Sequence, residues 1–262
     1  MEIKTHKQLQ RLRKLNFCYK CGQSFDKNKT RDHVPPKTLF QKKDRSHPLI
    51  LPAHLNCNND ESWSDEIMGQ LITVLHGIYP QKNKVKVKVK LAENSKNKQP
   101  VLILENINVH GFIWRCVKAF HAALYKEYLP QETDNWVDPP IRPGNKTNKG
   151  VVFEDLSPQF PILVKTIKQN RMAGRTDRIE CFTGKCVYEC TWETMDNGKW
   201  ACMFALNIYD WKNLGDPNHQ KRHGCVGFYM PKTGLPETAT TGIARTLEMP
   251  IPNFEPLDPF GG

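Results

Sequence analysis

With 262 residues, 39% of them hydrophobic and 25% charged, the chain is long enough for one large domain or two modest ones, and wholesale disorder is not expected. No stretch reaches the roughly 18 to 20 consecutive apolar residues of a membrane span, and no signal core lies near residue 1, so we expect a soluble cytoplasmic protein without membrane contacts. Residues 1–100 hold 20 Lys and Arg against 9 Asp and Glu, whereas residues 101–262 hold 18 of each, so the whole net charge of +11 lies in the first part and favours a polyanionic partner such as nucleic acid.

The first expected element is a short basic amphipathic helix over residues 4–15. Leu9, Leu12 and Leu15 recur there at helical spacing among basic residues. Such a helix either lies on DNA or packs with its charges in solvent.

Two pairs of metal-ligand residues come next, Cys18 with Cys21 and His54 with Cys57. A C-x2-C pair and an H-x2-C pair supply four ligands, which suits a structural tetrahedral Zn²⁺ with no coordination position left open. The alternative is buried thiols with His54 as a core histidine. Nine cysteines in a chain without an export signal also fit metal ligands and buried thiols better than a disulfide framework.

Between the two pairs stands the sequence Arg-Asp-His-Val-Pro-Pro-Lys, residues 31–37. Neighbouring side chains on an extended stretch point in opposite directions, so Asp32 cannot simply orient His33 and the two need separate tasks. Asn58 follows the second pair directly, where we expect the helix of this first module to begin.

A strand with one basic face is expected over residues 84–91. Lys84, Lys86, Lys88 and Lys90 alternate there with aliphatic residues, and residues 101–104 supply a return strand for a hairpin. The lysine row either binds phosphate or protects an exposed sheet face from aggregation.

The rest of the chain predicts a mixed module. Residues 111–129 and 160–172 are expected as helices, and strands are expected around residues 178–181, 186–192, 200–209 and 225–229, with an Asn-Gly hairpin turn at residues 197–198. We therefore predict an α+β protein divided into residues 1–80, a basic hairpin and helix over 81–129, a linker over 130–150, and a sheet-containing C-terminal module over 151–262.

The order of these motifs resembles the HNH endonucleases, also called His-Me finger or ββα-metal nucleases. The likeness comprises CxxC, Asp-His-Val-Pro-Pro and then Leu-Pro-Ala-His-x-x-Cys-Asn-x-x-x-Ser-x-x-Asp-Glu, over about residues 17–72 or roughly a fifth of the chain. It implies an N-terminal ββα-metal finger in which residues 31–51 form a hairpin with a long loop, a helix begins near Asn58, and zinc fastens the hairpin to the helix.

By this resemblance the chain is a metal-dependent endonuclease that hydrolyses DNA phosphodiester bonds, as in restriction or anti-phage defence. His33 matches the general base, and Asp32 and Asn58 match the ligands of a catalytic Mg²⁺ or Mn²⁺. The residue types agree, because imidazole titrates near neutrality and carboxylate and amide oxygens are hard ligands. Arg31, Lys37 and the lysine row are the expected nucleic-acid contacts.

Two positions depart from the family pattern. His54 stands where zinc-bearing relatives usually have cysteine, which imidazole replaces acceptably. The family's middle asparagine should fall near residues 46–49, where His47 is a candidate. Two alternatives stay open: a nuclease subunit that needs a partner such as an ATPase or a second copy of the chain, and a zinc-dependent nucleic-acid-binding protein without catalysis.

Overall fold

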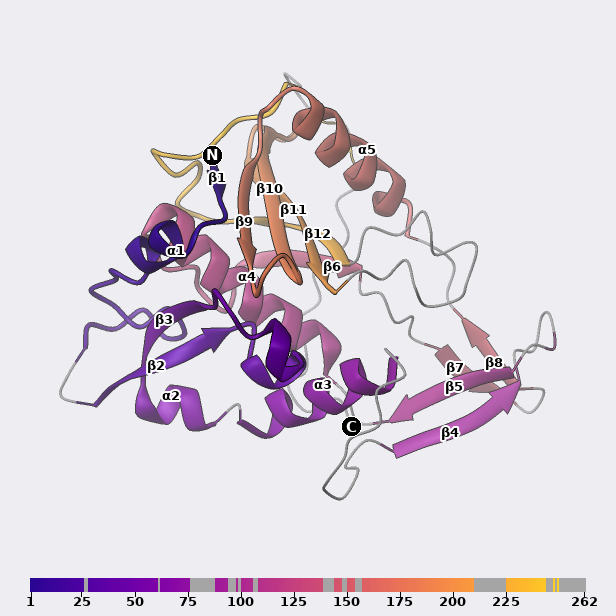
Figure 1. Ribbon diagram of the computed structural model, residues 1–262. Coiled ribbons are helices and arrows are strands. Elements are labelled where there is room, and N and C mark those ends of the chain that lie inside the picture. The colour runs from indigo at the N-terminus through magenta and orange to yellow at the C-terminus, as the bar shows by residue number, and fades with distance from the viewer. Residues whose placement is uncertain are drawn as a thin grey trace.

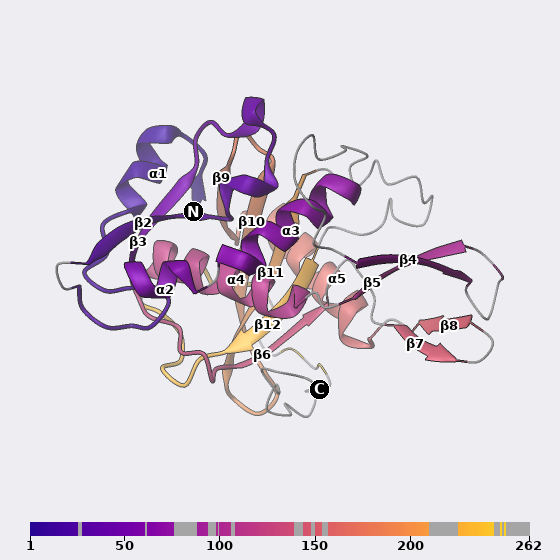
Figure 2. The same cartoon turned by 90° about the horizontal axis from the view of Figure 1, so that it is seen from below.

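The computed structural model describes residues 1–25, 28–60, 62–75, 88–93, 98, 100–105, 108–138, 144–147, 150–153, 157–209, 225–243, 247 and 249. Over these residues the protein is α+β, as the sequence predicts. Its largest element is a six-stranded mixed sheet with the order β1-β9-β10-β11-β12-β6, joined by three two-stranded sheets (Figures 1 and 2). None of the helices in these ranges has both the length and the apolar character that crossing a bilayer demands.

The helices and strands have the following bounds. The helices are α1 (His6–Leu12), α2 (Leu55–Asn59), α3 (Ser62–Leu75), α4 (Val109–Tyr125) and α5 (Gln159–Met172), with short 3₁₀ turns η1 (Lys37–Leu39) and η2 (Lys42–Asp44). The strands are β1 (Glu2–Ile3), β2 (Lys29–Val34), β3 (Leu49–His54), β4 (Lys88–Glu93), β5 (Pro100–Glu105), β6 (Asp134–Asp138), β7 (Gly144–Thr147), β8 (Gly150–Phe153), β9 (Asp177–Cys181), β10 (Cys186–Thr194), β11 (Trp200–Ile208) and β12 (Cys225–Met230).

The large sheet is covered on both faces, which explains why β10, β11 and β12 are buried along nearly their whole length. Alternate residues point to opposite faces. Tyr188 and Phe204 pack with Phe120 of α4 in one core, whereas Met203 and Phe228 pack in a second core with Leu163 of α5. The ring of Phe120 stacks on that of Tyr188 at 4.6 Å between centroids. The result is three layers, with α4 and α5 on opposite sides of the sheet (Figure 1).

The strand pair β2–β3 lies beside α4, and α2 and α3 follow it directly (Figure 1). β2 and β3 pair antiparallel with Asp32 opposite Leu51 and His33 opposite Ile50. The loop between them contains η1 and η2, and Phe40 in that loop stacks on Phe182, in the turn between β9 and β10, at 4.0 Å between ring centroids. This packing anchors the long loop that the sequence predicts within residues 31–51.

Several sequence predictions are confirmed by these elements. The helices over residues 4–15, 111–129 and 160–172 are α1, α4 and α5. α1 is shorter at both ends, α4 begins and ends a few residues earlier than predicted, and α5 begins one residue earlier and ends as predicted. The turn at residues 197–198 joins β10 to β11, with Gly198 at φ 76°, and β4 pairs antiparallel with β5. The helix expected to begin near Asn58 begins three residues earlier, at Leu55, so Asn58 lies within α2.

The expected linker over residues 130–150 is wrong in part, because Asp134–Asp138 form the edge strand β6 of the large sheet. This strand pairs with β12, where Val137 lies opposite Gly227. A Cβ atom on Gly227 would lie 2.4 Å from the carbonyl oxygen of Trp136, so the missing side chain is what allows the close approach. A short strand with two polar residues at its start carries little local signal, and long-range pairing decides it.

The N-terminal strand β1 pairs parallel with β9, so the first residues of the chain add a strand to a sheet built mainly from residues 134–230. The hairpins β4–β5 and β7–β8 extend together from one end of the molecule, away from β2–β3 (Figures 1 and 2). The division of the chain at residues 80, 129 and 150 stays a prediction.

Candidate functional site

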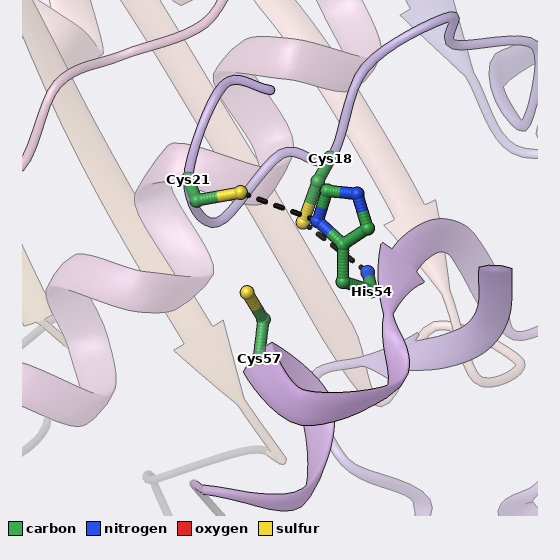
Figure 3. A group of neighbouring side chains, drawn as sticks. All are labelled: Cys18, Cys21, His54 and Cys57. Carbon is green, nitrogen blue, oxygen red and sulfur yellow. Dashed lines mark hydrogen bonds between the residues drawn. The ribbon is translucent and has the colours of Figure 1, made fainter. Parts of the chain in front are cut away.

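The four predicted metal ligands come together. One ligand atom from each of Cys18, Cys21, His54 and Cys57 lies within 4.8 Å of all the others, and this is the one such group of potential ligands among the described residues. Cys18 and Cys21 stand in the loop before β2, His54 ends β3, and Cys57 lies in α2 (Figure 3). The group could hold a metal ion, and three thiolates with one imidazole are compatible with structural zinc.

The loop that carries Cys18 and Cys21 is a tight turn. The amide of Gly22 donates to the carbonyl oxygen of Cys18 at 2.8 Å, the amide of Cys18 donates to Gln23, and Phe17 and Ser24 form a β-bridge that closes the turn. Gly22 has φ 78°, the left-handed conformation that glycine adopts without strain. The two sulfurs are thereby held side by side by backbone bonds.

His54 is oriented by its second ring nitrogen. Its Nε2 lies 3.1 Å from the carbonyl oxygen of Ser24, whereas its Nδ1 lies 3.3 Å from Sγ of Cys21. If Nε2 carries the proton and donates to Ser24, Nδ1 is the atom left to bind a metal, which is the usual arrangement around a ligating histidine.

The thiols of the group have opposite pKa shifts in the absence of a cation. Burial acts to raise the pKa of Cys18, but hydrogen bonds from the backbone at His54, Cys21 and Lys20 outweigh it, so that pKa falls below its ordinary value. Burial, and then the nearby Cys18, raise the pKa of Cys57 to about 12. A cation among the sulfurs would favour thiolate at both, since metal binding displaces thiol protons.

Asp32 and Asn58, the two predicted ligands of a catalytic ion, face each other. The terminal amide atom of Asn58 nearest Asp32 lies 3.1 Å from Oδ1 and 3.2 Å from Oδ2 of the carboxylate. This atom is the amide nitrogen, which donates to both oxygens, because an oxygen in its place would face only acceptors. Because Asn58 directly follows Cys57, the Cys/His group positions this contact.

Two residues that the sequence analysis did not single out complete the surroundings of Asp32. The hydroxyl of Tyr19 donates to its Oδ2 at 2.5 Å, and the ammonium of Lys20 lies 2.9 Å from the same oxygen. Lys20 also donates to the carbonyl oxygen of Cys57 at 3.1 Å. Both residues lie between the ligands Cys18 and Cys21, so the same turn that holds the sulfurs holds the partners of the carboxylate. Nothing in a C-x2-C pattern indicates that an intervening lysine is buried.

His33 occupies β2 next to Asp32 but on the opposite face of the strand. The burial of Asp32 and Val34 alternates with the greater exposure of Arg31 and His33. Burial lowers the pKa of His33, the positive charge of Lys37 lowers it further, and the charge of Asp32 partly opposes the shift. His33 is therefore neutral at pH 7, the form in which imidazole accepts a proton.

The surroundings of His33 are cationic. Arg31 on β2 and Lys37 at the start of η1 are exposed, and Arg13 after α1 contributes to the lowered pKa of His33. The Nε of Arg13 is buried without a hydrogen-bond partner. Arg13 is a basic residue of the predicted N-terminal helix whose position near His33 the sequence alone did not reveal.

The described lysines of the row are separated from this site. Lys88 and Lys90 belong to β4 and Lys90 is exposed, whereas Lys84 and Lys86 lie outside the described residues. β4 lies at the other end of the molecule from β2 and α2 in both views (Figures 1 and 2). Nucleic-acid binding by this row stays a prediction, and the fold does not bring Lys88 or Lys90 to Asp32.

His47, the candidate for the family's middle asparagine, contacts the rest of the fold partly through its backbone. It adopts φ 55°, its carbonyl oxygen accepts from the amide of Phe182 at 3.0 Å, and its exposed ring lies 5.4 Å from that of His6. These contacts attach the β2–β3 loop to the large sheet.

The other cysteines of the described part of the chain are buried core residues that form no disulfide: Cys116, Cys181, Cys186, Cys190, Cys202 and Cys225. Burial raises the pKa of Cys186, Cys202 and Cys225 well above the ordinary value, as for inert thiols.

In comparisons with protein-family models, with curated proteins and with solved structures, we found no match to this chain.

Proposed function

We propose that the protein is a divalent-metal-dependent endonuclease of the HNH type, which hydrolyses phosphodiester bonds in DNA. The observation that carries the proposal is the contact of Asn58 with Asp32 beside the Cys/His group. The resemblance assigns two hard ligands to these positions, and the amide nitrogen of Asn58 joins the two side chains by donating to the Asp32 carboxylate at 3.1 and 3.2 Å. The strand pair β2–β3 and the following α2 supply the ββα elements of the proposed finger.

Each residue has a chemical task in this proposal. Asp32 and Asn58 would hold Mg²⁺ or Mn²⁺, which supplies Lewis-acid stabilisation of negative charge at the phosphate. His33 lies on the face of β2 opposite Asp32 and has a lowered pKa, and in this proposal it would take a proton from the attacking water. Arg31 and Lys37 are exposed cations next to His33 and would contact the phosphate backbone. The Cys/His group has a structural task, since all four of its ligands are protein side chains.

The test is cleavage of supercoiled plasmid DNA by the zinc-loaded chain with Mg²⁺ or Mn²⁺. We expect nicking that EDTA abolishes and that His33→Ala reduces by about 10² to 10⁴-fold, the range for loss of a general base. His6→Ala is the matched control, because His6 is an exposed histidine on α1. Full activity of His33→Ala, or no cleavage by the wild type with either metal, would contradict the proposal.

A second candidate is a zinc-dependent nucleic-acid-binding protein without catalysis. The observation that favours it is the ammonium of Lys20, which already neutralises the Asp32 carboxylate at 2.9 Å. DNA binding that falls steeply with salt while every divalent ion leaves the plasmid intact would support this candidate over the nuclease.

A further inference from the structure

Lys20 is bound on two sides. Its ammonium lies 2.9 Å from Oδ2 of Asp32 and donates to the carbonyl oxygen of Cys57 at 3.1 Å, and its side chain is 6% exposed. Cys57 immediately precedes Asn58. Lys20 therefore holds a cation against the carboxylate at the point where Asp32 and Asn58 meet.

A second buried ion pair lies near Lys20. Asp65 on α3 is close enough for the charges of Asp32 and Lys20 to influence its pKa, and Asp65 is also paired with Arg115 of α4. The side chain of Arg115 is 7% exposed and that of Asp65 19%. Both ion pairs are largely buried. A divalent ion at Asp32 would add two positive charges beside an ammonium already in place, and the low polarity of the surroundings would strengthen the repulsion.

We propose that Lys20 competes with the divalent ion for Asp32, so that breaking the Lys20–Asp32 ion pair is part of metal binding and Lys20 sets the metal affinity of the site. This inference rests on the proposed function, since it concerns the same Asp32 site. Lys20 acts through Asp32 and is a positioning residue. Without a divalent ion the ion pair keeps the carboxylate neutralised, and with one the ammonium moves off Oδ2.

A purely structural role for Lys20 makes the opposite prediction. If the ammonium only held Asp32 and α2 in place, its loss would loosen the ligands and weaken metal binding. Competition instead requires tighter binding when the charge is removed. The sign of the change therefore separates the two roles.

The experiment is a titration of the zinc-loaded full chain with Mn²⁺, followed by electron paramagnetic resonance of free Mn²⁺. We expect Lys20→Met to bind Mn²⁺ about tenfold more tightly than the wild type, the size of effect that one neighbouring like charge has on a titrating site. Lys20→Arg keeps the charge and should stay within about twofold of the wild type. Lys29→Met removes an exposed lysine at the start of β2 and controls for net charge, and Asp32→Asn should abolish binding. One zinc per chain in each variant shows that the Cys/His group is intact.

A second measurement needs no variant. Acetylation of Lys20 by acetic anhydride, followed by mass spectrometry, should be slow in the zinc-loaded wild type because the ammonium is buried. Saturating Mg²⁺ should increase the rate severalfold if the ammonium leaves Asp32. Lys29 is the internal control, and its rate should not change.

Three outcomes separate the claims. Tighter Mn²⁺ binding by Lys20→Met, including binding that only this variant shows, supports the competition. The role of Lys20 is overturned if the wild type binds Mn²⁺ through Asp32 and Lys20→Met binds it equally or more weakly. It is also overturned if Mg²⁺ leaves the acetylation rate of Lys20 unchanged. Both results leave the nuclease proposal standing. If neither wild type nor Lys20→Met binds Mn²⁺, both this inference and the metal-dependent function are wrong.

Discussion

The side chains of Lys20 and Asp32 form an ion pair of 2.9 Å in which neither is more than 10% exposed. Removing one partner leaves the other charge buried, so Asp32→Ala should lower the free energy of unfolding by about 3 kcal/mol. The resemblance by itself assigns Asp32 only the task of binding metal, and on that basis alone the variant would lose turnover and keep its stability. Urea denaturation of the zinc-loaded wild type and variant, without Mg²⁺ or Mn²⁺, measures the difference in the free energy of unfolding.

The double variant Lys20→Met/Asp32→Ala is the control for this prediction. It removes both charges and should be more stable than Asp32→Ala alone, because no ammonium is stranded at Asp32. Equal stability of the single and double variants would mean that the ion pair contributes nothing to the fold.

Loss of one ligand of the Cys/His group should unfold the strand pair and α2. Cys57→Ser removes the ligand on α2, and since the binding energy of a structural metal is largely folding energy, we expect loss of zinc and of part of the circular dichroism signal. Cys116→Ala is the matched control, because Cys116 is buried in α4 outside the group. Unchanged zinc content and dichroism in Cys57→Ser would show that the four residues do not bind a structural metal.

Gly22→Ala should destabilise the cysteine turn. A Cβ atom on Gly22 would lie 2.6 Å from Cδ1 of Tyr128, and φ is +78°. Gly174 has φ +68° with open space around it, so Gly174→Ala should cost only the backbone strain, about 1 kcal/mol. We expect Gly22→Ala to lower the melting temperature more than Gly174→Ala and to speed zinc release to a chelator. Recovery in Gly22→Ala/Tyr128→Ala would identify the ring contact as the cause; equal melting temperatures of the two glycine variants would contradict it.

The pKa of His33 should rise when Lys37 is neutralised. Burial is the largest cause of its lowered pKa, and Lys37 is the second. In Lys37→Gln the protonated ring loses a repulsive neighbour, so its titration by NMR should move to higher pH. The general base works as neutral imidazole, so the acidic limb of the cleavage profile should move the same way. A titration of His33 at the same or lower pH in Lys37→Gln would refute the assignment.

His121 should make the fold less stable in mild acid. The ring is buried in α4, its Nδ1 lies 2.9 Å from the hydroxyl of Tyr229, and burial lowers its pKa to about 3. In the unfolded chain His121 becomes protonated below about pH 6.5, whereas in the native state it stays neutral down to about pH 3. Stability from this group is therefore present above pH 6.5 and falls by about 1.4 kcal/mol per pH unit as the pH decreases.

The control is His121→Gln, which keeps a polar group for Tyr229 without a titrating ring. Urea denaturation at several pH values between 4 and 7 gives the slope of stability with pH for each protein. The variant should have a smaller slope by about the amount of one proton. Identical slopes would mean that His121 is protonated in the native state.

Local patterns predicted much of the fold. Helical periodicity identified α1, α4 and α5, and the Asn-Gly turn identified the hairpin of β10 and β11. Each of these signals depends on residues close in sequence, with one face of the element buried. Strand β6 was not predicted, because its five residues are stabilised by pairing with β12, about ninety residues later in the chain.

For the candidate site, the sequence by itself determined the ligand chemistry. The spacing of Cys18 with Cys21 and of His54 with Cys57 was enough to predict that they share one metal, because each pair is a local turn. The resemblance also assigned Asp32 and Asn58 to one catalytic ion. The two side chains contact each other, whereas His33 lies on the opposite face of β2, and the catalytic roles stay a prediction.

Only the tertiary structure decided what surrounds that chemistry. The burial of Lys20 on Asp32, the ion pair from Asp65 to Arg115 and the position of Arg13 near His33 each join residues from separate elements. A lysine or arginine in a sequence is exposed by default, since burying a charge is costly unless a partner is present. Which charges find such partners depends on how α4 and the cysteine turn pack around β2, and no local pattern records that.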